Sequence, residues 1–292
     1  MGERVIGSLL VVVVGLFPLL IGGPIFALTM IVVGIAGYRE YLVLAGSASQ
    51  PGSGLYSQVG YAVVAALGCA ALLDRTAISL LAIAFLSVVA PLMALFPRPT
   101  HPGGFSKWAL VSTGSLYLGL PIYAAVAARS TSGAIDASWL AEIARRFAIG
   151  WDPAPRGLAC ALTVVLTIWV GDSVALFAGR ALGKRKLAFT ISPNKSQEGA
   201  AGGLLASMAV GAVSFQAFGL GAWWMGLVVG ALIGLAGQIG DLAESVLKRQ
   251  AGVKDSGSIV PGHGGILDRI DALLFAFPVG FLLASGLGRF GT

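Results

Sequence analysis

Residues 157–180 read GLACALTVVLTIWVGDSVALFAGR, an apolar stretch with only two charged side chains, Asp172 and Arg180. A helix needs about 20 such residues to cross a hydrocarbon core of about 30 Å. The stretch is long enough to do so, and it predicts a transmembrane helix. Because a carboxylate within hydrocarbon is energetically costly, we interpret Asp172 as a functional residue.

Comparable stretches recur along the whole chain. Hydrophobic residues make up 57% of the 292 and charged residues 11%, proportions outside the range of soluble globular domains. Barrel strands would be about half as long and would alternate in polarity, and these stretches do not. We predict an all-α polytopic membrane protein, a bundle of about nine transmembrane helices. The predicted spans are 4–22, 24–45, 56–74, 76–96, 107–128, 157–180, 199–219, 221–240 and 266–287.

Basic residues between the spans predict the orientation. If nine helices alternate, the loops near 46–55, 97–106, 181–198 and 241–265 share the face of the N-terminus and carry the larger share of Lys and Arg. This face is therefore predicted to be cytoplasmic. We expect a multi-pass protein of the cell (inner) membrane with a cytoplasmic N-terminus.

Polar sequence with recognisable motifs is concentrated toward the C-terminal end. We therefore interpret 1–130 as N-terminal scaffold helices, 131–156 as a non-cytoplasmic loop and 157–292 as a catalytic membrane region. Within the loop, residues 139–147 have the pattern of an amphipathic helix at the membrane interface.

The net charge of +6 indicates an anionic partner. Aromatic-interleaved basic patches are missing, and the basic residues lie near predicted membrane ends, so we expect membrane lipids or an anionic substrate and no nucleic acid. Cys69 and Cys160 lie in or beside predicted spans and are expected to be buried, inert thiols. His101 is expected to be a loop residue without a role.

A dense group of charges lies between residues 241 and 271. Isolated charges at helix ends usually just reach toward water. So many within one short segment indicate a functional site. The group holds five of the 13 carboxylates, four cations and one of the two histidines: Asp241, Glu244, Asp255, Asp268, Asp271, Lys248, Arg249, Lys254, Arg269 and His263.

The spacing of these charges suggests their chemistry. Asp241, Glu244 and Lys248 share one face if the eighth span continues as a helix. A new helix follows Gly264 and Gly265, and its first turn would offer free N–H groups to phosphate. Magnesium binds through one or two carboxylates plus substrate phosphates, while Lys and Arg neutralise other phosphate oxygens. The segment therefore predicts a phosphoryl- or nucleotidyl-transfer site at the cytoplasmic interface.

A second polar group follows Asp172. Residues 184–186 (KRK) are explained equally well as charges that set the membrane orientation. Ser192, Lys195 and Glu198, just before a span, suit phosphate or nucleotide binding. His263, between glycines, would either hydrogen-bond phosphate or shuttle a proton, and both roles stay open.

Residues 245–249 (SVLKR), 254–257 (KDSG) and 261–271 (PGHGGILDRID) resemble the signature of the phosphatidate cytidylyltransferases, also called CDP-diacylglycerol synthases. Residues 172–173 (DS), 179–180 (GR) and 192–199 (SPNKSQEG) resemble the family's other recurrent segment, so the resemblance covers about 165–290. Ser196 and Gln197 stand where the family commonly has Thr and Trp, and Leu176 replaces a frequent aromatic residue. Serine keeps the hydroxyl, so we expect activity to be retained.

The resemblance implies that the phosphate of phosphatidic acid attacks the α-phosphorus of CTP, giving CDP-diacylglycerol and pyrophosphate. Members of the family use magnesium, with potassium also found at the metal centre, and pack as homodimers. By the same resemblance Asp241 and Asp268 are the main metal ligands. Glu244, three residues after Asp241 on the same expected helix face, is predicted as a third ligand. Phosphates would be held by Lys248, Arg249, Lys254, His263 and Arg269, and the nucleotide side lined by Ser192, Lys195 and Glu198. Asp172, Asp255, Gly264, Gly265 and Asp271 complete the expected substrate-binding set, although Asp255 and Asp271 would also suit a role in ordering the loop.

Two other functions fit part of the pattern. A CTP-dependent lipid or polyprenol kinase, or a cytidylyltransferase for ether lipids, would use similar residues. A secondary transporter would explain Asp172 and glycines near the midplane, but no inverted repeat is visible and the charges cluster at a surface loop. The sequence contains no zinc spacing, no Walker A loop and no serine nucleophile elbow.

Overall fold

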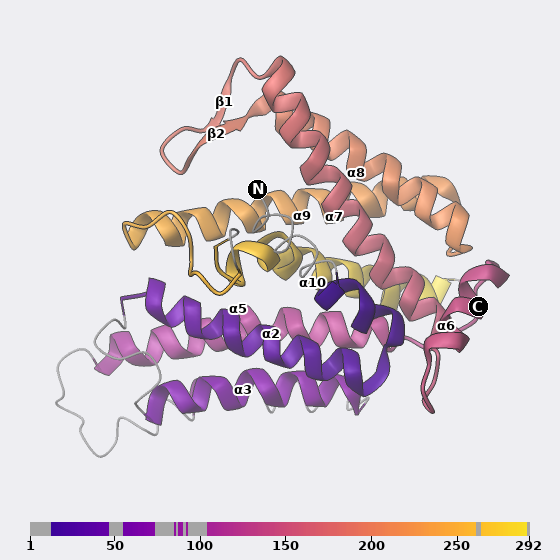
Figure 1. Cartoon of the computed structure of the whole chain (residues 1–292), viewed down its shortest axis with the longest axis horizontal. Coiled ribbons are helices and arrows are strands. Elements are labelled where there is room, and N and C mark those ends of the chain that lie inside the picture. Colours follow the sequence, from indigo (N-terminus) through magenta and orange to yellow (C-terminus); the bar gives the residue numbers. More distant parts are fainter. Residues whose placement is uncertain are drawn as a thin grey trace. The chain divides into compact units, whose positions relative to one another are not determined.

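The computed structural model describes residues 13–46, 55–73, 85, 87–89, 92, 104–260 and 264–290, and its elements are labelled in Figure 1. Residues 13–21 are helical. The other elements are the helices α2 (Gly23–Leu44), α3 (Leu55–Leu72), α5 (Gly104–Arg129), α6 (Ser138–Phe147), α7 (Pro155–Leu182), α8 (Gln197–Phe218), α9 (Trp223–Gln250) and α10 (Leu267–Phe290), and the strands β1 (Lys186–Ala188) and β2 (Ser192–Ser196).

The predicted helices are observed wherever the described residues cover them. Five helices in the described part of the chain are long and apolar enough to cross a membrane: α2, α5, α7, α8 and α9. The protein is therefore a predominantly helical, multi-pass membrane protein. The largest boundary error is at α9, which was expected to end at 240 and continues to Gln250. Most of the predicted span 76–96, and residues 4–12 of the predicted span 4–22, lie outside the described residues.

The chain forms two compact units. The first unit comprises Met1–Gly15, Pro24–Ala127 and Leu247–Arg269, and the second comprises Leu16–Gly23, Ala128–Val246 and Ile270–Thr292. This division differs from the regions drawn from the sequence. The segment Leu247–Arg269, which carries much of the charged motif, packs with the N-terminal helices that were expected to be scaffold.

Within the first unit, α2, α3 and α5 lie side by side (Figure 1). A Cβ added to Gly34 of α2 would meet Ile122 of α5 at 2.8 Å and Val64 of α3 at 3.0 Å, so a glycine allows the three helices to approach closely. Tyr38 is buried here and meets the ring of Tyr61 edge-on, with centroids 5.0 Å apart. This packing holds α2 in place just before its two charged residues, Arg39 and Glu40.

The helices of the second unit pack through small residues. A Cβ on Gly203 of α8 would meet Ala175 of α7 at 2.8 Å. Two turns further along α8, a Cβ on Gly211 would lie 2.7 Å from the Cα atom of Gly230 on α9. Small residues at such crossings allow backbones to touch, which is the usual way membrane helices associate.

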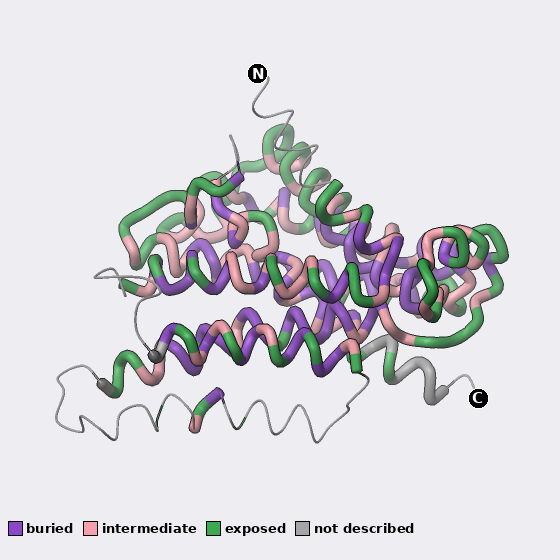
Figure 2. The backbone as a smooth tube through the Cα atoms, turned by 60° about the horizontal axis from the view of Figure 1, so that its bottom comes forward, coloured by how far each residue is buried: buried purple, intermediate pink, exposed green. Residues whose placement is uncertain are grey.

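Many residues of the described helices are exposed (Figure 2), and large apolar side chains are among them. Phe177 of α7 is 66% exposed, Leu205 of α8 65% and Val213 of α8 66%. Such surfaces are uncommon on soluble monomers and suit contact with lipid chains.

Residues 181–198 were expected to form a loop in an all-α protein, and this expectation is wrong. β1 and β2 form a two-stranded antiparallel sheet in which Lys186 pairs with Ser196 and Ala188 with Ser192. The hairpin continues directly into α8. Ser196, the last residue of β2, caps this helix, because its side chain accepts a hydrogen bond from the Gly199 amide (3.1 Å).

The expected amphipathic helix is confirmed as α6, although its position at a membrane interface stays a prediction. Trp139 is 52% exposed, and Glu142 pairs with Arg145 and Arg146 on the polar side. The expectation of buried cysteines is wrong for Cys69, which is exposed on α3. A thiol on an apolar membrane helix can face the lipid instead of the protein interior.

A buried arginine closes the turn before α7. Arg129 is 1% exposed and donates to four carbonyl groups: Leu19 (2.7 Å), Leu20 (3.1 Å), Pro153 (3.3 Å) and Ala154 (3.3 Å). Ala154 has a φ of 41°, a left-handed conformation that is strained for alanine. Its amide donates to Asp152 (2.9 Å), and this bond, together with one from Ser132, lowers the pKa of the Asp152 carboxyl.

We expect Arg129→Ala to destabilise the protein by about 3 kcal/mol or more, because buried carbonyls lose their donors at about 1–3 kcal/mol each. Thermal inactivation in detergent measures this, with Arg145→Ala as the control because Arg145 is exposed on α6. Equal inactivation rates for the two variants would show that Arg129 does not hold this turn together.

Candidate functional site

The helix of the eighth span continues beyond residue 240, which is the condition under which Asp241, Glu244 and Lys248 were expected to share one face. α9 runs unbroken through Asp241, Glu244 and Lys248, so these residues lie on consecutive turns of one helix. Their exposure differs. Glu244 has no exposed surface, whereas the side chain of Asp241 is 33% exposed and that of Lys248 13%. Of the two carboxylates on this part of α9, Asp241 is the accessible one.

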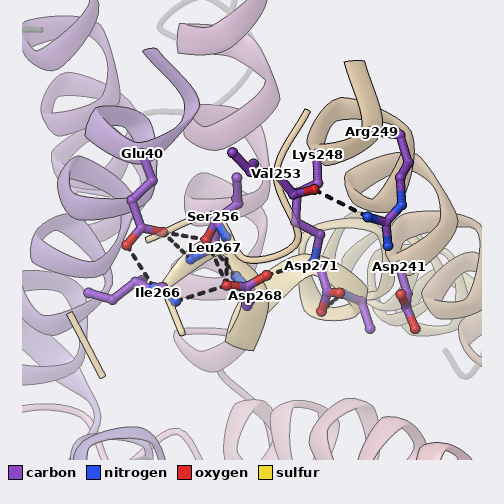
Figure 3. A network of polar contacts seen from close by, with 12 residues as sticks. Glu40, Asp241, Lys248, Arg249, Val253, Ser256, Ile266, Leu267, Asp268 and Asp271 are labelled. Atoms are coloured by element: carbon purple, nitrogen blue, oxygen red, sulfur yellow. Dashed lines mark hydrogen bonds and ion pairs between the residues drawn. The ribbon is translucent and has the colours of Figure 1, made fainter. Parts of the chain in front are cut away.

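Asp268, in the first turn of α10, is the centre of a polar network in the first unit (Figure 3). Its Oδ2 atom accepts hydrogen bonds from the Ser256 amide (2.9 Å) and the Gly265 amide (2.8 Å), and lies 3.0 Å from the Ser256 hydroxyl. Its Oδ1 atom pairs with the Lys248 ammonium at 2.6 Å. The carboxylate is thereby held with one oxygen in the loop and the other toward a cation.

Glu40 of α2 enters the same network from a distant part of the sequence. It is 4% exposed, and its carboxylate accepts hydrogen bonds from the amides of Ile266 (3.0 Å) and Leu267 (2.8 Å) and from the Ser256 hydroxyl (2.8 Å). The negative charge lies at the N-terminus of α10, where the helix dipole stabilises it. Glu40 therefore connects the N-terminal helices to the loop 251–266 between α9 and α10 (the motif loop).

Two glycines of the motif are required by this geometry. Gly264 has a φ of +86°, and a Cβ there would lie 2.7 Å from Asp268 Oδ2. A Cβ on Gly265 would overlap the Ser256 hydroxyl and the Glu40 carboxylate. The glycines expected to admit a ligand instead admit carboxylates of the protein itself.

The expectation that the first turn of α10 offers free N–H groups to phosphate is therefore wrong. The amides of Gly265, Ile266 and Leu267 donate to Asp268 and Glu40. The Asp268 amide lies 3.3 Å from the Ser256 hydroxyl. The negative charge at this helix terminus is supplied by the protein's own carboxylates, Asp268 and Glu40.

The other charged residues of the loop lie toward its surface. Arg249 is exposed and donates to the Val253 carbonyl (3.3 Å), which ties the end of α9 to the loop. Lys254, Asp255 and Arg269 are exposed as well. Three cations of this segment are thus exposed to solvent. His263 lies outside the described residues.

The second unit holds a second carboxylate–lysine pair. Lys195 of β2 forms an ion pair with Asp241 of α9, and Asp172 of α7 is close enough to interact electrostatically with both. Three residues predicted from separate motifs are therefore brought together. Ser192 lies at the start of β2, in the hairpin that carries Lys195.

Glu198 supports this hairpin. Its carboxylate accepts hydrogen bonds from the backbone amides of Lys184 (3.1 Å) and Arg185 (3.2 Å), at the start of the hairpin. A residue expected to line the nucleotide side therefore closes the hairpin on itself. Glu198 therefore affects the position of Lys195 only indirectly, by holding the hairpin whose strand β2 carries the lysine.

α9 and α10 approach each other closely within the second unit. A Cβ on Gly240 would lie 2.5 Å from the backbone carbonyl of Asp271. The Asp271 carboxylate accepts a hydrogen bond from the Ala272 amide (2.7 Å). Asp241 follows Gly240, so the α9 turn with Asp241 packs next to α10 at Asp271.

The described carboxylates fit magnesium. No three Asp, Glu, His or Cys side chains converge in the described part of either unit, so there is no cage made of protein ligands alone. Magnesium rarely uses one, since it binds through one or two carboxylates plus substrate phosphates and water. Asp268 Oδ1 and the partly exposed Asp241 are hard oxygen donors of this kind, and each already contacts a lysine ammonium.

Sequence reasoning missed Glu40 and Ser256 as members of the site. The rule that singled out Asp172, a carboxylate within an apolar span, applies equally to Glu40. Ser256 carried no such signal, because a serine in a loop is common.

Residues 2–286 match the family model described as the cytidylyltransferase family. A phosphatidate cytidylyltransferase of Brucella abortus is 32% identical over 282 residues, which cover 97% of this chain and 92% of that protein.

Two staphylococcal relatives match a shorter part. Phosphatidate cytidylyltransferases of Staphylococcus saprophyticus and Staphylococcus haemolyticus are 45% identical over 131 residues and 48% identical over 125 residues. These matches cover 44% and 42% of this chain, and the chain spans about half the length of each relative, 50% and 48%.

Proposed function

Because this chain belongs to the cytidylyltransferase family, we propose that it is a phosphatidate cytidylyltransferase, which converts CTP and phosphatidic acid to CDP-diacylglycerol and pyrophosphate. The observation that carries the proposal is the match to the Brucella protein over 97% of the chain. The two carboxylate–lysine pairs, Asp268–Lys248 and Asp241–Lys195, support it because they suit polyphosphate chemistry.

In the proposed reaction an oxygen of the phosphatidate phosphate forms a bond to the α-phosphorus of CTP. The bond from that phosphorus to the oxygen bridging to the β-phosphorus breaks, and pyrophosphate leaves with the electron pair. The attacking phosphate is already ionised at neutral pH, so no strong protein base is required. Orientation and neutralisation of charge therefore supply most of the rate.

By the family resemblance Asp241 and Asp268 are the expected magnesium ligands, and magnesium when bound would offset the repulsion between the two phosphate groups. Glu244, the third predicted ligand, is buried and would act by supporting α9. Lys248 would neutralise phosphate oxygens next to Asp268, as would the exposed Arg249, Lys254 and Arg269. His263 would hydrogen-bond phosphate.

The hairpin residues Ser192 and Lys195 would bind the nucleotide, with Glu198 holding the hairpin and Asp172 orienting Lys195. Asp255, Gly264, Gly265 and Asp271 would shape the loop that receives phosphate. CTP would reach the site from the cytoplasm and the lipid from within the inner membrane. The family resemblance also supports a homodimer and a potassium ion beside magnesium, and the distribution of basic residues between the spans supports a cytoplasmic N-terminus.

Purified protein supplied with α-labelled CTP, phosphatidic acid and Mg²⁺ should form labelled lipid and one pyrophosphate per lipid. Mixed vesicles that also contain polyprenol and an ether-linked acceptor should give label in CDP-diacylglycerol first. Release of CDP would instead indicate a kinase, and labelling of the ether lipid alone a different acceptor. Absence of any CTP-dependent product, with uptake of a solute into vesicles, would favour a transporter.

A further inference from the structure

Glu40 is buried in α2, far in sequence from the charged motif, yet it binds the motif loop through three hydrogen bonds. Carboxylates are almost never buried without partners, because removal of their hydration is costly. If α2 were only a scaffold helix, an apolar residue at position 40 would avoid this desolvation cost. The buried carboxylate is therefore explained by its hydrogen bonds to the loop.

The loop is shaped around this carboxylate. A Cβ on Gly257 would lie 2.5 Å from Glu40 Oε1, and a Cβ on Gly265 would overlap both Glu40 oxygens. Ser256, which directly precedes Gly257, is itself only 5% exposed. Small residues on both sides of the loop thus make the space that Glu40 occupies.

Glu40 reaches Asp268 through Ser256. The Ser256 hydroxyl lies 2.8 Å from Glu40 Oε2 and 3.0 Å from Asp268 Oδ2, and it has one proton to donate. Both carboxylates also accept from neighbouring amides, Glu40 from Ile266 and Leu267 and Asp268 from Gly265. Glu40 therefore fixes the backbone and the hydroxyl that hold Asp268 Oδ2, and leaves Oδ1 directed at Lys248 (Figure 3).

We infer that Glu40 is a positioning residue for catalysis. Acting through Ser256 and the 265–267 backbone, it holds the Asp268 carboxylate so that Oδ1 is directed at a bound metal cation. The inference rests on the proposed function in that the cation is taken to be the magnesium of nucleotidyl transfer. Partners that orient a metal ligand in this way typically contribute about 10- to 100-fold to metal affinity or activity.

The test compares Glu40→Gln with Glu142→Gln, which removes a carboxylate of the same length from the exposed face of α6. Glutamine keeps the shape but brings an NH₂ group against the amides of α10. We expect Glu40→Gln to bind Mn²⁺, used as a spectroscopic probe for Mg²⁺, about tenfold more weakly in an electron paramagnetic resonance titration. The kcat per folded protein should fall by about 10- to 100-fold.

Ser256→Ala provides the second variant, and it keeps the test decisive if Glu40→Gln folds poorly. It should weaken Mn²⁺ binding in the same direction, and the double variant should lose no more than the worse single one, because both act on Asp268 by one route. Unchanged Mn²⁺ affinity in both single variants, with losses confined to the yield of folded protein, would overturn the inference. A wild-type protein that binds Mn²⁺ but forms no CDP-diacylglycerol would refute the proposed function alone.

Discussion

Replacement of Asp268 by asparagine should lower the rate of CDP-diacylglycerol formation by on the order of 1,000-fold. Residues that merely orient a metal ligand contribute about 10- to 100-fold, and the ligand itself should contribute more. Asparagine can still accept from Ser256 and Gly265, but it would turn an NH₂ group toward the Lys248 ammonium that now lies 2.6 Å from Oδ1. The loss should appear in kcat and in the Mg²⁺ concentration required for half-maximal rate.

This substitution also leaves a charge without its partner, so stability must be separated from catalysis. The side chains of Asp268 and Lys248 are only 5% and 13% exposed, and removal of one member of such a pair destabilises a protein by about 3–5 kcal/mol. The double variant Asp268→Asn/Lys248→Met removes the leftover ammonium and should recover much of the stability without recovering activity. Recovery of activity together with stability would show that Asp268 has only a structural role.

Replacement of Asp241 by asparagine should lower the rate by about 100-fold or more for the same reason, but with little change in stability. The Asp241 and Lys195 side chains are 33% and 29% exposed, and ion pairs with this degree of exposure contribute only about 0–1 kcal/mol. Activity, Mg²⁺ dependence and thermal inactivation should be measured on the same preparation. Asp136→Asn, in an exposed stretch before α6, is the matched control.

A double-variant comparison separates the role of Asp241 from that of its partner. If Lys195 also binds phosphate, Lys195→Met should raise the KM for CTP, and the double variant should combine that effect with the loss in kcat. If Lys195 only neutralises Asp241, the double variant should match Asp241→Asn. Full activity of Asp241→Asn at ordinary Mg²⁺ concentrations would remove it from the metal site.

Much of the helical structure could be predicted from the sequence because the local signal is strong in a membrane protein. Backbone groups in hydrocarbon must be satisfied within the segment, so an apolar run of sufficient length becomes a helix almost regardless of its neighbours. Residues 157–180 predicted α7 to within two residues at each end. The hairpin of β1 and β2 was missed because its residues are polar and their pairing depends on Glu198 and on the start of α8.

The site was predictable only in part. The spacing of Asp241, Glu244 and Lys248 identified one helix, and the resemblance pointed to Asp268 and Lys195. The contacts among them were not predictable: that Lys195 pairs with Asp241, or that Glu198 serves the hairpin, depends on how separate elements pack. Local periodicity carries no information about such pairs.

The sequence by itself determined that this protein is a multi-pass helical membrane protein with charged motifs, because helix length and polarity are properties of short segments. Only the tertiary structure decided that Glu40 belongs to the site. Glu40 and Ser256 are 216 residues apart, and they meet because small residues allow the motif loop to approach α2. The same packing decided which amides are available: the first turn of α10 would bind phosphate by its local structure, but Glu40 and Asp268 occupy its donors.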